Sequence, residues 1–267
     1  MIIHIVTSNF TLKAKSKRYV VSFKEKEYEF PAIKTDCIVL NPHGNLTSAA
    51  VKLAEEYKTT IIFVDDNFKI VYLGFLDVDK DIKYFLGQVE SFLHRKEEYA
   101  KMFSKAAGNS RKQIVKYLNL GFESEGDFWR DEEKYIQHLE EAFGHEIRYM
   151  VNFARARLVA ECLHFLLKTG LHPSLGFLHE GEASLARDLA LELQYNVCDL
   201  TAVNVAKKSG TIKNLVQMYQ KKMETSFTHP VLKRQTTYRE AIKIQAKTLA
   251  ATMVSPDIKY SPLRTRI

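Results

Sequence analysis

The sequence predicts an α+β protein of two domains, in which a small β-rich domain over residues 1–76 precedes a larger all-α domain over residues 77–267. Short runs of β-branched and aromatic residues, separated by polar turns, fill most of the first 76 positions. From Asp79 onward the apolar residues instead recur every three or four positions, which is the period of an amphipathic helix. The chain has 267 residues, of which 46% are hydrophobic, so it has enough apolar side chains for buried cores.

The first domain is expected to consist mainly of strands. The segments with strand composition are 2–6, 18–23, 28–30, 37–40, 60–65 and 68–74. One helix is expected over 46–57, where Thr47 or Ser48 can cap the first turn and apolar residues follow at helical spacing. The polar residues 65–67 stand between two strands and are typical of a hairpin turn rather than of a metal site.

Helices are expected over most of the second domain. An amphipathic stripe of apolar residues begins at Ile82 and predicts the first helix. The other segments with helical spacing are 97–103, 111–118, an acid-rich segment over 132–141, 145–168, 215–223 and 238–250. Segment 145–168 is expected to form one long amphipathic helix.

The helical pattern is broken in the middle of this domain. Two glycines and a proline interrupt it over residues 170–178, and His179 stands at the end of the break. A second helix is expected to begin near Ser184, which suits an N-cap, so that Asp188 and Glu192 share one helix face. A loop histidine opposite two acids can hold a divalent cation. The alternative is that His179 caps a turn and that the acids form a solvated helix face.

Positive charge is concentrated at the carboxyl end. Residues 201–267 hold 13 basic and 3 acidic side chains, a surplus of +10, whereas the preceding 200 residues carry a net −3. Such an asymmetry indicates a surface that binds a polyanion, most often nucleic acid; the alternative is a basic, flexible tail. Three of the basic residues repeat every four positions on the last predicted helix. The residues expected to contact phosphates are Arg239, Lys243, Lys247, Lys207 and Lys208.

Cysteine usage and hydropathy favour a soluble cytoplasmic protein. Cys37, Cys162 and Cys198 are odd in number and lie among apolar neighbours, which favours buried free thiols over a disulfide framework or a zinc site. No segment approaches the roughly 20 apolar residues that span a bilayer. The first six residues also lack the basic start of a signal peptide.

The amino-acid sequence around the central break resembles the signature of a known family. Residues 170–180 read GLHPSLGFLHE and residues 184–189 read SLARDL. Together they resemble the signature of the CRISPR-associated adaptation integrase and endonuclease family, in which a Gly-Leu-Asp-Pro-x-x-Gly-Phe-x-His run precedes Ser-Leu-x-x-Asp. The order of elements in residues 1–76 is similar to the family's amino-terminal β domain. Residues 241–249 resemble its carboxy-terminal Ala-Ile-x-x-Gln-Ala-x-x-Leu helix, so the resemblance covers nearly the whole chain.

The resemblance implies a reaction, a cofactor and partners. Members of the family bind Mg²⁺ or Mn²⁺ through a Glu, a His and an Asp, and insert short foreign DNA into the repeat array by attack of a 3′-hydroxyl on a phosphodiester. A divalent metal neutralises charge around the phosphorus and positions the attacking and departing oxygens. The resemblance also implies double-stranded DNA as substrate, a homodimer formed through the β domain, and a small ferredoxin-like adaptation partner protein.

Site residues can be carried over from the family one by one. The family's His corresponds to His179, and its first helix Asp corresponds to Asp188. Its Glu belongs to a Leu-x-Gly-x-Glu-Gly turn, which Glu125 matches best and Glu123 second best. The resemblance therefore implies His179, Glu125 and Asp188 as the catalytic residues. The further acids that stay open as the ligand from this region are Glu132, Glu133 and Glu141.

The chain departs from the family at one metal ligand. The family's ligating acid lies three residues after the first helix Asp, where this chain has Leu191. Because leucine cannot ligate a cation, either Asp188 or Glu192 takes over, or the metal is bound weakly. The alternative to a metal-dependent integrase and endonuclease is therefore a catalytically weakened or inactive DNA-binding scaffold of the same fold; an RNA-directed nuclease is a third hypothesis.

Three arginines in the second domain could also contact nucleic acid. Arg148, Arg155 and Arg157 lie on the long predicted helix, where a guanidinium can bind phosphate. Alternatively, they pair with Glu161 or with the acids upstream. The sequence leaves both possibilities open.

Overall fold

The computed structural model describes residues 1–74, 78–255 and 257–263. The chain is a mixed α and β protein, with strands in the amino-terminal part and mostly helices after them. It divides into two compact units, residues 1–81 and residues 82–267. The domain boundary predicted at residues 76 and 77 falls outside the described residues.

The first unit contains two four-stranded sheets. One sheet has the order β1 (Ile2–Ile5), β5 (Cys37–Leu40), β7 (Thr60–Val64) and β8 (Ile70–Leu73), with the first three strands parallel and β8 antiparallel to β7. The other has the order β4 (Lys26–Pro31), β3 (Arg18–Phe23), β2 (Phe10–Lys15) and β6 (Gly44–Leu46). A short 3-10 turn, Ala32–Lys34, and helix α1 (Ser48–Tyr57) complete the unit. All six strands predicted from composition are present, whereas β2 and β6 were missed.

The missed strand β2 pairs with strands on both of its sides. Its sequence FTLKAK carries two lysines, which hide the strand signal, yet Phe10 and Leu12 alternate with polar residues and are 1% and 0% exposed. These side chains share one core with Ile38 of β5 and Ile61 of β7. The predicted cap of α1 is confirmed, because the Thr47 hydroxyl accepts a hydrogen bond from the amide of Ala50.

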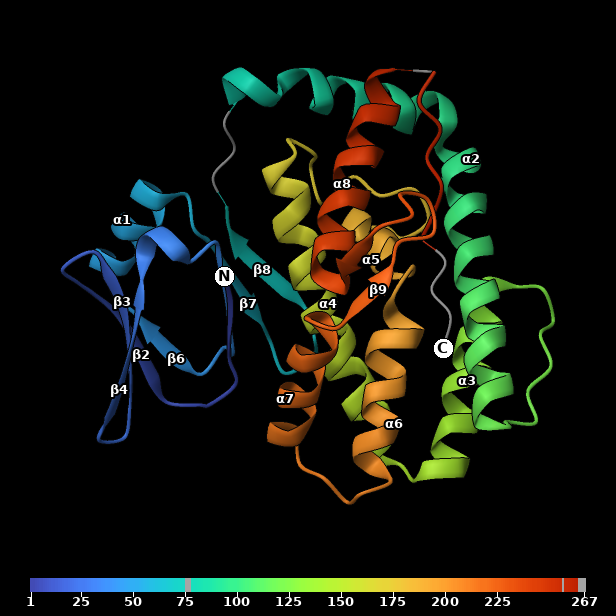
Figure 1. Cartoon of the computed structure of the whole chain (residues 1–267), viewed down its shortest axis with the longest axis horizontal. Helices are drawn as coiled ribbons and strands as arrows, with labels where there is room; N and C mark the ends of the chain where they lie inside the picture. The colour runs from blue at the N-terminus through green and yellow to red at the C-terminus, as the bar shows by residue number, and fades with distance from the viewer. Residues whose placement is uncertain (75–77, 256, 264–267) are drawn as a thin grey trace. The chain divides into compact units, whose positions relative to one another are not determined.

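The second unit is helical. Its elements are α2 (Val78–Leu118), α3 (Phe128–Phe143), α4 (Glu146–Lys168), α5 (Ser184–Ala190), a π-helical turn (Gln194–Asp199), α6 (Leu200–Ala206), α7 (Ile212–Met223), the hairpin strands β9 (Ser226–Thr228) and β10 (Gln235–Thr237), and α8 (Tyr238–Val254). Figure 1 shows α2 as two arms, one crossing the top of the view and one descending beside α3. The arms meet at Arg95, whose φ of −132° is not helical. Among the described residues, no helix is both long enough and apolar enough to cross a membrane.

Helix α4 lies at the centre of this unit rather than at its surface. It packs against α3, α5, α6, α7 and α8. Burial extends around the whole helix and includes Arg157, Glu161 and His164, which are at most 2% exposed. The prediction of an amphipathic helix was therefore correct in position but wrong in environment, because polar side chains that mimic a solvated face are enclosed by neighbouring helices.

Candidate nucleic-acid and metal site

The His179 loop is held by one buried carboxylate. The loop joins α4 to α5, and Asp188 of α5, which is 0% exposed, accepts hydrogen bonds from the backbone amides of Phe177, Leu178 and His179 at 2.6, 3.0 and 2.9 Å. It also accepts a bond from His179 Nδ1 at 2.7 Å. The carboxylate thus folds the loop around itself, and both its oxygens are used.

Two further contacts explain the glycine and the helix start in this motif. A Cβ on Gly176 would lie 2.6 Å from the carbonyl carbon of Ser184, so only glycine fits there. The Ser184 hydroxyl accepts a hydrogen bond from the Gly176 amide at 2.9 Å. It does not cap α5, so the N-cap role predicted for Ser184 was wrong. Gln88 of α2 fixes the start of the loop by bonding to His172 in both directions, at 2.7 and 2.9 Å.

The arrangement determines which nitrogen of His179 is available. Because Asp188 accepts the bond from Nδ1, the proton of the neutral ring lies on Nδ1 and Nε2 keeps its lone pair. A carboxylate behind the imidazole is typical of histidines that bind a metal. Asp188 therefore positions the imidazole, and it has no oxygen left to act as a ligand itself.

Besides Asp188, aromatic side chains of α3 lie next to the His179 ring. The rings of Trp129 and Phe128, at the start of α3, meet the imidazole edge-on with centroid separations of 5.0 and 6.4 Å. The Glu125 carboxylate is 54% exposed and pairs with Lys134 Nζ at 3.0 Å. Glu123 is also exposed. Across the described parts of the chain, no three His, Cys, Asp or Glu side chains are grouped so that they could hold a metal ion.

Glu192 does not share a face with Asp188, so that expectation was wrong. Helix α5 ends at Ala190, and the chain turns before Glu192. The carboxylate accepts hydrogen bonds from Gln245 Nε2 and the Leu263 amide, both at 2.7 Å, and from the Tyr260 hydroxyl. Leu191 is itself 2% exposed. Glu192 therefore anchors the carboxyl-terminal segment against α8.

Burial of Glu192 makes stability depend on pH. Burial raises its pKa to about 7, although the hydrogen bonds from Tyr260, Leu263 and Gln245 partly oppose the shift. Between 4.5, the ordinary value, and about 7 the folded state keeps a proton that the unfolded chain has released, so stability falls as pH rises through this window. The expected loss is roughly 3 kcal/mol. Urea unfolding at several pH values should show this decline for the wild type and not for Glu192→Gln; equal slopes would contradict the assignment.

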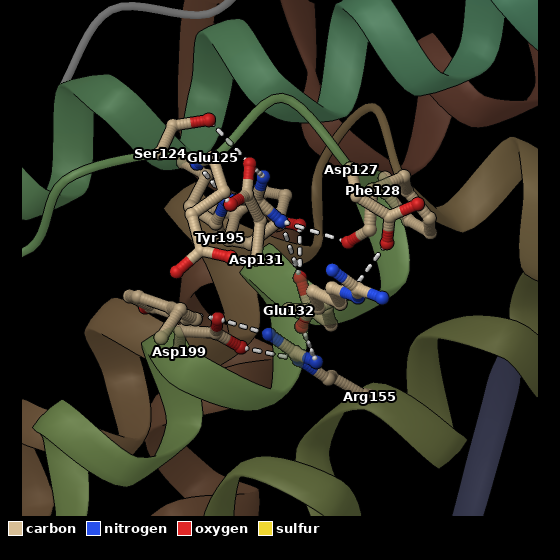
Figure 2. Close-up of polar contacts among 12 residues, drawn as sticks. Ser124, Glu125, Asp127, Phe128, Asp131, Glu132, Arg155, Tyr195 and Asp199 are labelled. Atoms are coloured by element: carbon tan, nitrogen blue, oxygen red, sulfur yellow. Dashed lines mark hydrogen bonds and ion pairs between the residues drawn. The ribbon is translucent and has the colours of Figure 1, made fainter.

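A network of arginines and acids occupies the space between α3, α4 and the π-helical turn (Figure 2). Its first half surrounds Arg111 of α2, which is 3% exposed. Arg111 donates to Asp131 at 2.9 Å and to Glu132 at 3.2 Å. Asp131 in turn accepts bonds from the Glu125 amide at 2.7 Å and from the Ser124 hydroxyl, so it organises the loop that carries Glu125.

The second half of the network surrounds Arg155 of α4. Its guanidinium binds both oxygens of Asp199, at 2.7 and 2.5 Å, and one oxygen of Glu132 at 2.5 Å. Tyr195 and Tyr135 donate their hydroxyls to Glu132 and Asp199, at 2.5 and 3.1 Å. The two guanidiniums thus supply the positive charge that Glu132 and Asp199 require, as a metal ion would elsewhere.

Two carboxylates of this network, Asp199 and Glu132, have pKa values that are shifted in opposite directions. Burial raises the pKa of Asp199 even though Arg155 opposes the shift. Burial also acts on Glu132, but Arg155, Tyr195 and Arg111 together outweigh it and lower its pKa. Glu132, one of the acids left open as a metal ligand, is therefore an ionised partner of arginines. The sequence did not single out Asp131, Asp199 or Tyr195, and no local pattern marks them.

The other two arginines are also occupied within the protein. Arg148 pairs with Glu133 and Glu140 at 2.9 and 2.8 Å. Arg157 is 1% exposed, and burial lowers its pKa to about 10. Glu141, exposed on α3, pairs with a histidine one turn away. None of these groups lies beside His179.

The basic residues expected to bind DNA fall into two sets. Lys243 and Lys247 are exposed on α8, and Lys207 and Lys208 are exposed just after α6. Arg239, by contrast, is 17% exposed and pairs with Glu161 at 2.7 Å and with Glu224. The four lysines can therefore reach a phosphate backbone, whereas Arg239 is committed to an internal ion pair.

An amino-terminal β unit, a helical unit and a glycine-broken histidine loop together define the class of CRISPR adaptation nucleases and integrases. The profile of the family "CRISPR associated protein Cas1" matches residues 3–147 and 144–237, and the chain belongs to this family. A curated relative, the CRISPR-associated endonuclease Cas1 1 of Moorella thermoacetica, is 29% identical over 139 residues, which are 44% of this chain and 40% of that protein. The match thus spans less than half of that relative.

Solved structures share the fold over nearly the whole chain. A Cas1 protein from Thermotoga maritima has a TM-score of 0.74 at 16% identity, and the match covers 97% of this chain and 98% of the Thermotoga chain. A casposase bound to integration product has a TM-score of 0.77 at 16% identity, and the match covers 97% of this chain and 92% of the casposase chain. A Cas6-RT-Cas1–Cas2 complex contains a region with a TM-score of 0.73 at 11% identity, covering 98% of this chain and 36% of that one. At these identities the likeness establishes the fold.

Proposed function

We propose that this chain acts in CRISPR adaptation as a subunit that binds double-stranded DNA and positions it for insertion into the repeat array, without assembling a complete metal site from its own residues. The observation that carries the proposal is the donor set around His179. Leu191, which is 2% exposed, stands where the family has a ligating acid. Asp188 accepts four hydrogen bonds and has no free oxygen.

The residues present do not fit Mg²⁺ or Mn²⁺. Both ions prefer several oxygen ligands. Besides Asp188, the described residues around the His179 ring include the aromatic side chains of Phe128 and Trp129, while Glu125 and Glu192 are bonded to other groups. One imidazole nitrogen is too few ligands for a hard divalent cation.

Charge and the fold support the DNA-binding part of the proposal. The surplus of +10 over residues 201–267 includes the exposed lysines of α8, which lie one turn apart on the helix. The casposase with the same fold was solved with an integration product. The family resemblance implies a homodimer and a small ferredoxin-like adaptation partner, and we propose both for this chain; a structural neighbour is a complex that contains Cas1 and Cas2.

The proposal predicts DNA binding that depends on salt and on the lysines of α8. Replacing both Lys243 and Lys247 by alanine should weaken binding to a blunt duplex about tenfold at about 0.1 M salt and reduce the salt slope by about 2, because each lysine releases about one counterion. EDTA should leave binding unchanged. Fluorescence anisotropy of labelled DNA, titrated at several salt concentrations, measures all three effects.

A matched control is available on another helix. Lys112 and Lys116 are exposed on α2 with the same four-residue spacing. Their double alanine variant should bind DNA like the wild type. Equal losses in both double variants would mean that binding reflects overall charge only, and binding abolished by EDTA would contradict a metal-independent scaffold.

The second candidate function is metal-dependent integration or DNA cleavage. The specific observation in its favour is the His179–Asp188 pair, since a carboxylate behind an imidazole is the usual support of a metal-binding histidine. Strand transfer of a 3′-hydroxyl oligonucleotide in Mn²⁺, with the partner protein present, distinguishes the two. A joined product that disappears in His179→Ala would establish this second function and overturn the first.

A further inference from the structure

The loop that joins β9 to β10 exposes two apolar side chains in a row. Residues 229–234 read HPVLKR. Val231 and Leu232 are 58% and 44% exposed. Tight loops usually carry Gly, Asn, Asp or Ser at such positions, so two neighbouring branched apolar residues depart from the ordinary composition of a turn. Neither the lysines assigned to DNA binding nor the network of arginines and acids uses this loop.

A buried histidine holds the loop in one shape. His229 is 1% exposed, and its Nδ1 atom accepts hydrogen bonds from the backbone amides of Val231 and Leu232 at 3.3 and 3.2 Å. The His229 amide donates to the Arg234 carbonyl, and the Lys233 amide donates to the His229 carbonyl, both at 2.9 Å. The exposed positions of the two apolar side chains are therefore set before a ligand binds, which reduces the entropy lost on binding.

The hairpin is also fixed to the helix that carries the DNA-binding lysines. The Phe227 ring of β9 stacks on Tyr238, the first residue of α8, with 4.6 Å between centroids and 25° between planes. The His229 ring lies at 23° to Phe227, with 6.4 Å between centroids. At the helical rise per residue, Lys243 lies about 8 Å further along α8 than Tyr238. The loop and the lysines of α8 are thus close enough to contact one duplex.

The charges beside the apolar residues favour DNA as the ligand. Lys233 and Arg234 follow Leu232 directly, and both are exposed. The Arg234 guanidinium is 3.5 Å from Glu240, and the two side chains are 61% and 50% exposed, so this pair costs little to separate. Proteins that bind the minor groove combine the same features, because an apolar side chain enters between two base pairs while neighbouring cations neutralise phosphates.

We infer that the loop 229–234 is a wedge that enters the minor groove of a DNA duplex and bends it. Val231 and Leu232 open a base step, and the two cations that follow them lie at the flanking phosphates. The inference rests on the proposed DNA-binding function and adds the form of duplex that is bound. Steps that unstack easily, such as TA, are preferred to stiff A-tracts.

Resonance energy transfer between dyes at the two ends of a short duplex measures the bend. The wild type should bend a duplex with a central TA step by roughly 20 to 90°. It should bind this duplex about tenfold more tightly than a duplex with a central A-tract. The double variant Val231→Gln, Leu232→Gln should lose the bend and the preference, and should bind the A-tract duplex like the wild type, because the cations remain.

A second pair of variants tests the role of His229, which acts by positioning the loop. His229→Ala removes the acceptor of the two loop amides and should reduce the bend. His229→Asn should keep the bend, because an Asn side-chain oxygen can accept hydrogen bonds from amides that follow it in a turn. Equal bending by the wild type and His229→Ala would show that the loop needs no such support.

A matched control comes from two leucines of α2. Leu86 and Leu93 are 58% and 68% exposed, so Leu86→Gln, Leu93→Gln removes a comparable apolar surface. This variant should bend DNA like the wild type. Thermal melting of each variant checks that it is folded.

The outcomes separate the inference from the proposed function. If the wild type binds both duplexes without bending either, the inference is overturned while the DNA-binding function stands. The same holds if the double glutamine variant bends DNA as the wild type does, which is the result expected of a loop that contacts a partner protein instead. If neither duplex binds, the proposed function fails as well.

Discussion

Replacing Asp188 by alanine is expected to lower the free energy of unfolding by about 4 kcal/mol. The carboxylate is fully buried and accepts three amide bonds and one imidazole bond from residues 177–179. Alanine leaves these donors without an acceptor in a site that excludes water, so their desolvation is no longer compensated. Urea denaturation followed by circular dichroism gives the change directly.

Two variants make this prediction specific. Asp188→Asn keeps the shape and one oxygen, and should lose less, about 2 kcal/mol. Glu180→Gln changes a carboxylate of the same loop that is 84% exposed, and should alter stability by less than about 0.5 kcal/mol. If Asp188→Ala were no more destabilising than Glu180→Gln, Asp188 would not hold the loop, and it could be considered as a ligand again.

Replacing Arg155 by methionine is expected to cost a similar amount, about 4 kcal/mol. Methionine keeps the length of the side chain, but it leaves Asp199, which is 0% exposed, and Glu132 without their shared cation. Since burial already raises the pKa of Asp199, the carboxyl should take up a proton in the variant. Urea denaturation near pH 7 measures the cost, and the variant should become relatively more stable as pH falls.

A double-mutant cycle tests whether the network acts as a unit. Combining Arg155→Met with Asp199→Asn should cost less than the sum of the single changes, with a coupling of roughly 2 kcal/mol, because the second change removes the charge that the first left unpaired. Arg148→Met removes an arginine whose side chain is 36% exposed, and should cost less than about 1 kcal/mol. Additive costs at Arg155 and Asp199 would show that the two do not interact in solution.

Much of the fold was predictable because it depends on local pattern. The strands of the first unit alternate or cluster β-branched residues, and α7 and α8 show helical spacing, so periodicity located them. Thr47 caps α1 through an amide three residues away, and the hairpin turn at Asp65 is closed by its own side chain. Interactions that span two to four residues are visible in the sequence. Two features were not visible in this way. The lysines of β2 concealed its strand pattern, and the burial of α4 on every side depends on helices that are distant in the sequence.

The candidate site was predictable in its histidine and not in its acids. The run ending at His179 is continuous in sequence, so its motif alone was enough to indicate the Cas1 family. The neighbours of His179 are set by how α3 packs onto the loop, which brings Trp129 there and leaves Glu125 with Lys134. Choosing among Glu123, Glu125 and Glu132 by spacing alone was therefore not possible.

By itself, the sequence determined the family, the division into a β-rich and a helical part, the Gly170–Asp188 motif, and the basic carboxyl end. The tertiary structure decided what each charged group does. Asp199 meets Arg155 across 44 positions, and Glu192 meets the Leu263 amide across 71. Whether a carboxylate binds a metal, an arginine or an amide depends on burial and on such distant partners, because desolvation makes each buried charge require a neighbour, and only the folded chain supplies one.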